Sequence, residues 1–80
     1  MLSQLENNAK VVGAKQTRRA LRDGKAVRIY LAKDADPALT EPMEALSLEH
    51  QVAVEWIPTM KDLGKACGIA VGAAVAAVLA

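Results

Sequence analysis

The chain has 80 residues with one Trp, one Tyr and no Phe, which predicts one small domain, residues 1–80, with a core of small aliphatic side chains. The net charge of +1 hides a segregation, because eight of the nine charged residues between Lys10 and Lys33 are basic, whereas all six between Asp34 and Glu55 are acidic. A single cysteine excludes an internal disulfide and a cysteine metal centre, and the uncharged run at residues 66–80 is too short to span a membrane.

Capping residues, β-branched runs and glycines predict the elements of the first half of the chain. These elements are a short helix opened by the capping box Ser3-x-x-Glu6, a minimal strand at Val11-Val12 that stops at Gly13, a helix over residues 14–23 followed by Gly24, and a strand over residues 27–32.

The longest helix follows Asp36-Pro37, which resembles an N-cap with proline at the first helical position. Because Pro42 is not expected deep inside a helix, this helix should start near Thr40–Glu41 and run to about His50. Three further elements are a strand over residues 52–57 closed by Pro58, a short helix opened by Thr59-x-x-Asp62 that ends near Gly68, and an apolar last strand over residues 73–79 that should be buried on both faces. Alternating strands and helices predict an α/β domain with three layers around a small four-stranded sheet.

The helix over residues 14–23 carries the strongest charge pattern. Its basic residues share one helical face at positions i, i+3, i+4 and i+7, namely Lys15, Arg18, Arg19 and Arg22. Ala14, Thr17 and Leu21 form the opposite stripe, which should face the sheet. Four like charges repel one another, so the arrangement favours a bound polyanion over the alternative of a plain solvated face.

The start of this helix offers a second argument for an anionic partner. Free backbone N–H groups and the helix dipole favour a phosphate there, and Gly13 permits close approach of the backbone. Gln16 can donate to and accept from a base edge, and Arg19 can make paired hydrogen bonds to a guanine edge or a phosphate. The alternative for Gly13 is an ordinary strand-to-helix turn.

Three segments resemble the ribosomal protein L7Ae/L30e superfamily, and in particular its short members from Firmicutes. They are Gly13-Ala14-Lys15-Gln16-Thr17, Ala32-Lys33-Asp34-Ala35-Asp36-Pro37 and Leu63-Gly64-Lys65-Ala66-Cys67-Gly68-Ile69, the last being the most specific. The resemblance covers nearly the whole chain. It implies an α/β/α sandwich with a four-stranded mixed sheet, and it implies binding of kink-turn RNA, a sharply bent helix with tandem sheared G·A pairs.

The resemblance also implies which residues contact RNA at the start of the basic helix. Gly13 and Ala14 match the family pattern, and Arg19 occupies the position of its usual Lys. Lys15 stands where the family has Asn and Gln16 where it has Glu, so the pattern of base contacts differs from the usual one and the patch is more basic.

A second contact implied by the resemblance is an apolar loop that packs on a flipped-out base. Ile69, Ala70 and Val71 match this loop, and Lys61 and Lys65 could hold nearby phosphates. The alternative for Ile69 and Val71 is a place in the core, and the sequence alone favours the core for Val71.

No set of residues predicts catalysis or a metal site. His50 is expected to be a surface residue or a helix C-cap, and Cys67 a small buried side chain. Asp34 and Asp36 follow a strand and are expected to cap the helix after it. The two aromatic residues lie on predicted strands and should be largely buried: Tyr30 and Trp56.

These patterns and the family resemblance together predict a noncatalytic, monomeric, cytoplasmic RNA-binding protein without a cofactor, a small-molecule substrate or a membrane partner. The resemblance implies that it stabilises kink-turns and associates with the ribosome, although ribosomal RNA, an RNase P-like RNA and a riboswitch leader all remain open as targets. The alternative is a small protein-interaction module that uses the acidic region at residues 34–55, with an incidental basic face.

Overall fold

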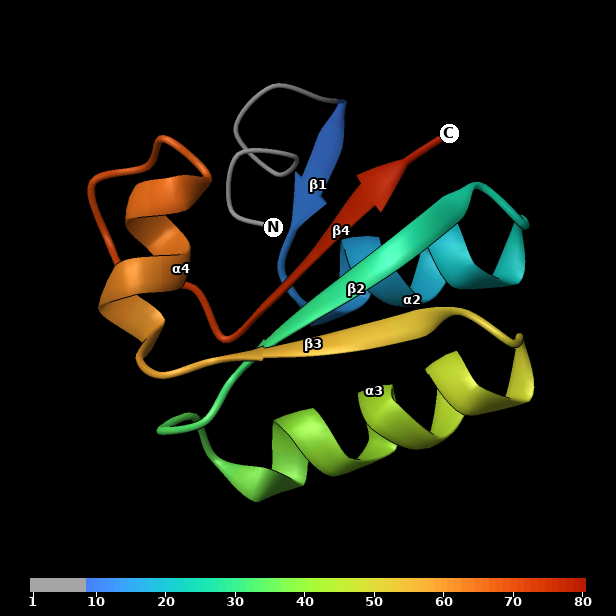
Figure 1. Ribbon diagram of the computed structural model, residues 1–80, viewed down its shortest axis with the longest axis horizontal. Coiled ribbons are helices and arrows are strands. Elements are labelled where there is room, and N and C mark those ends of the chain that lie inside the picture. Colours follow the sequence, from blue (N-terminus) through green and yellow to red (C-terminus); the bar gives the residue numbers. More distant parts are fainter. Residues whose placement is uncertain (1–8) are drawn as a thin grey trace.

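The computed structural model describes residues 9–80, so the predicted helix at Ser3-x-x-Glu6 lies outside the described residues. Strands and helices alternate along the rest of the chain, as the sequence predicts (Figure 1). The elements are β1 (Lys10–Val12), α2 (Ala14–Arg22), β2 (Ala26–Ala32), α3 (Pro37–Glu49), β3 (Ala53–Ile57), α4 (Met60–Ala66) and β4 (Val75–Leu79).

The four strands form one mixed sheet in the order β1-β4-β2-β3. The interior strand β4 is antiparallel to both of its neighbours, β1 and β2, whereas β2 and β3 are parallel and are connected through α3. This arrangement confirms the predicted α/β fold with a four-stranded mixed sheet.

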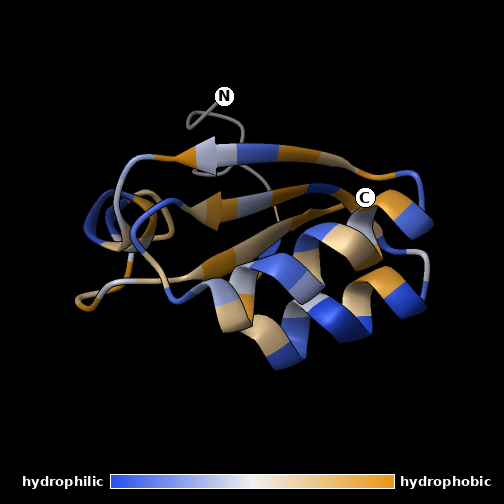
Figure 2. Ribbon diagram, turned by 90° about the horizontal axis from the view of Figure 1, so that it is seen from below, coloured by the Kyte–Doolittle hydropathy of each residue, from blue (hydrophilic) through white to orange (hydrophobic). Residues whose placement is uncertain are grey.

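Helices cover both faces of the sheet, so the domain has three layers. On one face, Ile29 and Leu31 of β2 pack with Leu21 of α2 and Met43 of α3. On the other face, Tyr30 of β2 lies in a separate apolar cluster that includes Leu63 and Ala66 of α4 and the residue after them, Cys67. Figure 2 shows α2 and α3 lying together against the sheet, with hydrophilic residues on their outer sides.

The last strand is buried on both faces, as its continuous apolar character predicts. Val75 and Ala77 belong to the cluster under α2 and α3, and Ala76 and Val78 belong to the cluster on the face that carries α4. None of these four side chains is more than 1% exposed. Because alanine is small, both helical layers can approach this strand closely.

Each of the three helices within residues 9–80 ends in the same backbone motif. The residue after the C-cap has a positive φ in every case, at Gly24 (70°), Gln51 (60°) and Gly68 (77°). At Gly68, for example, the Gly68 N–H donates to the Lys65 carbonyl and the Ile69 N–H donates to the Gly64 carbonyl. The predicted ends at Gly24 and Gly68 are therefore confirmed, and α3 ends in this way without a glycine.

The predicted start of the longest helix is wrong, because α3 begins at Pro37 and contains Pro42. The Asp36 side chain accepts a hydrogen bond from the Ala38 N–H at 2.9 Å, and the Thr40 N–H donates to the Asp36 carbonyl at 3.2 Å. The helix is thus already formed before Pro42. This proline removes only the bond that would run to the Ala38 carbonyl, and both residues are exposed to solvent.

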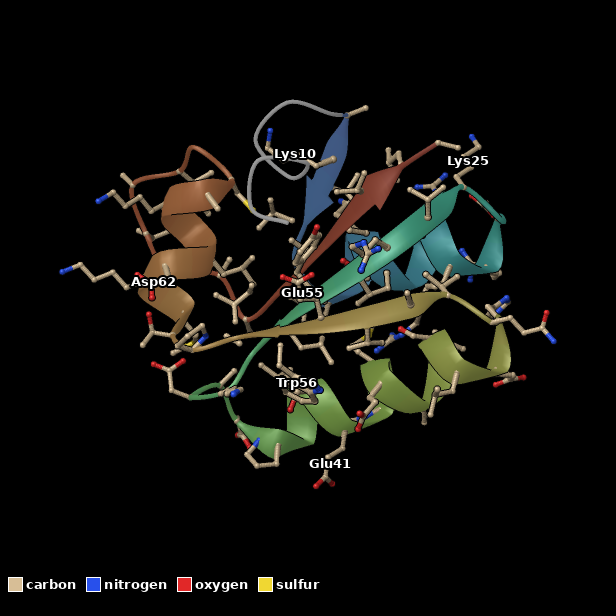
Figure 3. All side chains as sticks on the ribbon, in the orientation of Figure 1. Lys10, Lys25, Glu41, Glu55, Trp56 and Asp62 are labelled. Carbon is tan, nitrogen blue, oxygen red and sulfur yellow. The ribbon has the colours of Figure 1, made fainter. Side chains whose placement is uncertain are left out.

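One of the two aromatic predictions is also wrong. Tyr30 is fully buried, but Trp56 is 36% exposed because β3 lies at the edge of the sheet and has a neighbour on one side only. In Figure 3 the Trp56 side chain lies beside α3 at this edge.

Candidate nucleic-acid interface

The start of α2 is held by the sheet while its backbone stays open. Gly13 has φ 103° and ψ 153°, a conformation essentially restricted to glycine, and its N–H donates to the Val75 carbonyl at 2.8 Å. A Cβ built on Gly13 would meet no atom within 4 Å. No side chain caps α2 and no acidic residue lies in its first turn, so its N-terminal N–H groups can receive an external anion.

Five exposed side chains of α2 surround a hollow of about 250 Å³ on its outer face: Lys15, Gln16, Arg18, Arg19 and Arg22. The opposite side of the helix is occupied by Thr17 and Leu21, both buried, and by the half-buried Ala14. The predicted division of α2 into an outer basic face and an inner sheet-facing stripe is therefore confirmed.

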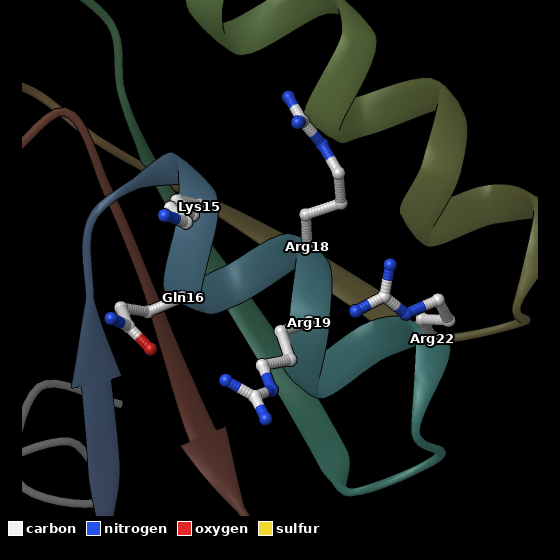
Figure 4. A pocket seen from close by; sticks show the side chains of 5 residues that line it. All are labelled: Lys15, Gln16, Arg18, Arg19 and Arg22. Carbon is white, nitrogen blue, oxygen red and sulfur yellow. The ribbon is translucent and has the colours of Figure 1, made fainter.

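The basic side chains do not all point the same way, as Figure 4 shows. Arg18 extends toward α3, whereas Gln16 and Arg19 extend toward β1 and β4. A second, smaller hollow lies on the β1 side of α2, and both Gln16 and Arg19 line it. The basic face is thus broad enough to meet phosphates at several positions across α2.

The positive charge of this face is not neutralised within residues 9–80. Residues 9–80 form one ion pair, between Arg28 of β2 and Glu55 of β3 at 3.7 Å, and it does not involve α2. No carboxylate of the described part of the chain lies within 4.0 Å of the cationic groups of α2. An external polyanion would therefore relieve the mutual repulsion of these four cations.

The loop that follows α4 exposes its apolar side chains. Ile69 is 37% exposed, Val71 is 70% exposed, and Ala70 is exposed as well. The placement of Val71 in the core, which the sequence favours, is therefore wrong. The reason is a close approach of two backbones, because Gly64 is buried in α4 and a Cβ built on it would overlap the Val71 carbonyl oxygen. The Val71 backbone thus packs on α4 and its side chain remains outside.

Asp34 and Asp36 both cap helices, but different ones. Asp36 caps α3, which follows it in the chain, as predicted. Asp34 instead accepts a hydrogen bond from the Met60 N–H, the first residue of α4, at 2.7 Å. The expectation that both residues cap the following helix is wrong for Asp34, because the loop after β2 lies against the loop after β3.

The three segments that carry the family resemblance meet at the edge of the sheet where β1, β2 and β3 end and β4 begins. The Gly13 N–H donates a hydrogen bond to the Val75 carbonyl, and the Ala32 N–H at the end of β2 donates to the Ala74 carbonyl at 2.9 Å. The Asp34–Met60 bond joins the second segment to the helix of the third. Backbone pairing therefore brings together the start of α2 and the end of the apolar loop, which are about sixty residues apart.

Exposed lysines also lie on or next to the second and third of these segments. Lys61 and Lys65, predicted to hold phosphates, are exposed on α4. Lys33 is exposed at the end of β2, where its N–H donates to the Ile57 carbonyl at 2.8 Å, but it is not among the predicted RNA contacts. The sequence offered one indication of a role for Lys33, namely its place in the second resemblance segment. That Lys33 lies near the other two segments follows only from the pairing of the strands.

The remaining candidates behave as structural residues. His50 is the exposed C-cap of α3, and Cys67 is the buried C-cap of α4. Burial raises the pKa of the Cys67 thiol, and the charge of Lys10 partly offsets this rise. Within residues 9–80, no group of three or more His, Cys, Asp or Glu residues could hold a metal ion, and no helix is long and apolar enough to cross a membrane.

Comparison with known proteins gives a consistent result. The model of the ribosomal protein L7Ae/L30e/S12e/Gadd45 family matches residues 2–80. An RNA-binding protein of Geobacillus sp. (strain WCH70) is 45% identical over 75 residues, which are 94% of this chain and 92% of the relative. The large ribosomal subunit protein eL8 of Halobacterium salinarum is 33% identical over 69 residues, which are 85% of this chain and 58% of that protein.

The same fold is present in a solved structure, the 15.5kD RNA binding protein of Giardia lamblia. It matches with a TM-score of 0.92 at 25% sequence identity, over 99% of this chain and 70% of that chain. The descriptions of the family and of these relatives name RNA-binding and ribosomal proteins and no enzymatic activity. The match over nearly the whole chain, the identity to the relatives and the shared fold show that the chain belongs to the ribosomal protein L7Ae/L30e/S12e/Gadd45 family.

Proposed function

We propose that the chain is a noncatalytic RNA-binding domain that recognises and stabilises kink-turn motifs in structured RNA. The observation that carries this proposal is the unneutralised basic face of α2, a helix whose start is hydrogen-bonded to the strand that follows an exposed apolar loop. A partner must then offer both closely spaced negative charge and an accessible apolar ring. A bent RNA with an unstacked base offers both. The names of the relatives support RNA as the partner.

The two parts of the interface have different roles. Gly13 and Ala14 let the start of α2 enter a widened groove, where Gln16 and Arg19 reach base edges and Lys15, Arg18 and Arg22 neutralise phosphates. Ile69, Ala70 and Val71 cover a flipped-out base, which they contact without reading its hydrogen-bonding groups. Two lysines of α4, Lys61 and Lys65, hold phosphates beside this base.

The mechanism is a shift of the RNA population. A kink-turn samples straight and bent forms, and a protein that binds the bent form better increases its share. The bent form crowds phosphates together, and the cations of α2 lower the cost of that crowding. Because phosphate contacts release counterions, the affinity should fall as the salt concentration rises.

The deciding experiment uses a doubly labelled RNA that carries tandem G·A pairs and a three-nucleotide bulge. Titration with protein should increase energy transfer between the RNA ends and should show tighter binding than an RNA whose G·A pairs are replaced by Watson–Crick pairs. Equal, weak binding of both RNAs without bending would refute kink recognition and leave a nonspecific polyanion surface.

We propose a single domain over residues 1–80 that acts as a monomer in the cytoplasm, in association with the ribosome. The ribosomal name of one relative, eL8 of Halobacterium salinarum, supports the last point.

A second candidate function is a protein-interaction module. It is favoured by one observation, the exposure of Leu48 (68%) and Leu39 (47%) on α3, in the acidic part of the chain. In that case the kink-turn RNA and its Watson–Crick control would bind equally. Binding of the protein partner would not weaken with salt in the way that phosphate contacts of the α2 cations do.

A further inference from the structure

We propose that Asp34 is a positioning residue of the RNA interface, which holds the apolar loop after α4 in its binding shape without contacting RNA. This inference rests on the proposed function and adds to it the residue that preorganises the loop of residues 68–73. Hydrogen bonds connect Asp34 to the first residue of α4, and that residue to the end of the loop.

The first step is a hydrogen bond between distant parts of the chain. The Met60 N–H at the start of α4 donates to the Asp34 Oδ1 at 2.7 Å, across 26 positions in the sequence. The local N-cap, Thr59, accepts from a different donor, the Asp62 N–H, at 3.0 Å. The short helix α4 therefore has two caps, and the bond at its first residue depends on the loop after β2.

The second step joins Met60 to the end of the apolar loop. The Met60 carbonyl accepts a hydrogen bond from the Ala73 N–H at 3.0 Å. A Cβ built on Gly72 would lie 3.1 Å from the Met60 Cβ, so the loop backbone is packed directly on this residue. Met60 is thus held by Asp34 through its N–H and holds the loop through its carbonyl and its side chain.

The third step concerns the start and middle of the loop. The Ile69 N–H donates to the Gly64 carbonyl at 3.1 Å, and the Val71 carbonyl oxygen lies over Gly64. The loop therefore runs back along α4 and is attached to it at both ends, as its path in Figure 1 shows. With the backbone held in this way, the Ile69 and Val71 side chains are kept on the outside.

The charge of Asp34 makes a direct contact with RNA unfavourable. It is an exposed carboxylate at the edge where phosphates should bind, next to Lys33. Its charge instead faces the N-terminus of α4, where a negative group is favourable. Loss of Asp34 should release the first turn of α4 and reduce the fraction of molecules whose loop is ready to bind, and the apparent affinity falls by that fraction.

The test compares three variants on two RNAs. The first RNA is the labelled kink-turn described above, and the second is the same RNA with an abasic residue in place of the flipped-out base. Asp34→Ala should weaken binding of the first RNA by roughly threefold to tenfold, the factor expected for loss of a cap, and should weaken binding of the second much less. Asp34→Asn keeps an acceptor oxygen and should restore most of the affinity.

The matched control is Asp36→Ala. It also removes an aspartate cap, that of α3, but α3 carries no part of the loop. This variant should leave the ratio of the two affinities at its wild-type value. A ratio lowered equally by Asp36→Ala and by Asp34→Ala would assign the effect to general stability and overturn the proposal.

A second measurement requires no RNA. Amide hydrogen exchange should be faster at Met60 and Ala73 in Asp34→Ala, while the amides of β2 keep their wild-type rates. Unchanged exchange at Ala73, or tighter RNA binding by Asp34→Ala, would overturn the proposal. Failure of the proposed function would be recognised separately, because the wild-type protein would then not distinguish the kink-turn from its Watson–Crick control.

Discussion

The start of α2 and the end of the apolar loop after α4 lie at one edge of the sheet, yet the basic face and the loop are built in different ways. The basic face comes from one helix and depends on the spacing of its residues, with the sheet serving as a support for the inner stripe. The loop has no regular structure and depends on three contacts with α4, at Met60, Gly64 and the helix end. A helix presents charge by periodicity alone, whereas a loop presents apolar side chains only when its backbone is held elsewhere.

Two glycines show the same contrast. Gly13 at the start of α2 is needed for its positive φ, and the space around it is open. Gly64 in α4 has an ordinary helical backbone, and it is needed because the Val71 carbonyl oxygen occupies the place of a side chain. One glycine therefore serves the backbone conformation and the other serves the packing of the loop.

The largest effect is expected from Gly64→Ala, which separates the loop from α4. The added methyl group overlaps the backbone of Val71, so either the loop or the helix must move. Overpacking of this kind should lower the free energy of unfolding by about 1–3 kcal/mol, measured by urea denaturation. Binding of a kink-turn with a flipped-out base should weaken more than binding of the abasic RNA. Unchanged stability together with unchanged binding would show that the loop is not held on Gly64.

The next effect concerns the basic face. Arg19→Ala should weaken kink-turn binding by about 1–3 kcal/mol, because Arg19 is placed to contact a base edge or a phosphate on the β1 side of α2. The measurement is the fluorescence titration described above. Arg28→Ala is the control, since it removes an arginine that is paired with Glu55 and lies outside the interface. Wild-type affinity in the Arg19 variant would contradict the proposed orientation of the RNA on α2.

A smaller effect is expected from Ile69→Ala at the loop. Ile69 is partly exposed, and covering a base should add the burial of a few methylene groups, so the loss should be about 1 kcal/mol on the RNA with a flipped-out base. Paired titrations of this RNA and its abasic counterpart measure the difference. Equal losses on both RNAs would indicate that Ile69 supports packing and does not contact the base.

The smallest effect is expected from Arg22→Ala at the end of α2. This residue should contact a phosphate only, so its loss should reduce affinity by less than about 1 kcal/mol and should lower the slope of log affinity against log salt by about 1. Titrations at several salt concentrations give the slope. A slope equal to that of the wild-type protein would place Arg22 outside the interface.

The difference between the two regions also explains which expectations the structure confirms. The bounds of α2, its inner and outer faces and the helix ends at Gly24 and Gly68 are confirmed. Each depends on interactions between residues a few positions apart, such as the spacing of side chains on a helix or the hydrogen bonds that follow a left-handed glycine. The sequence displays such interactions directly.

Three of the expectations that failed depend on interactions between distant residues. The exposure of Val71 depends on Gly64, the partner of Asp34 is 26 positions away, and the exposure of Trp56 follows from the place of β3 at the sheet edge. The start of α3 failed for a local reason, since the capping by Asp36 outweighs the single hydrogen bond lost at Pro42.

The sequence by itself determined the α/β class, the basic face of α2 and the two-sided burial of β4, because periodicity and capping are local properties of the chain. Only the tertiary structure decided that the apolar loop is exposed, that Asp34 caps α4, and that three distant segments share one edge. The physical reason is that these features depend on the order of the strands β1-β4-β2-β3 and on close approaches between backbones, which no local pattern of side chains specifies.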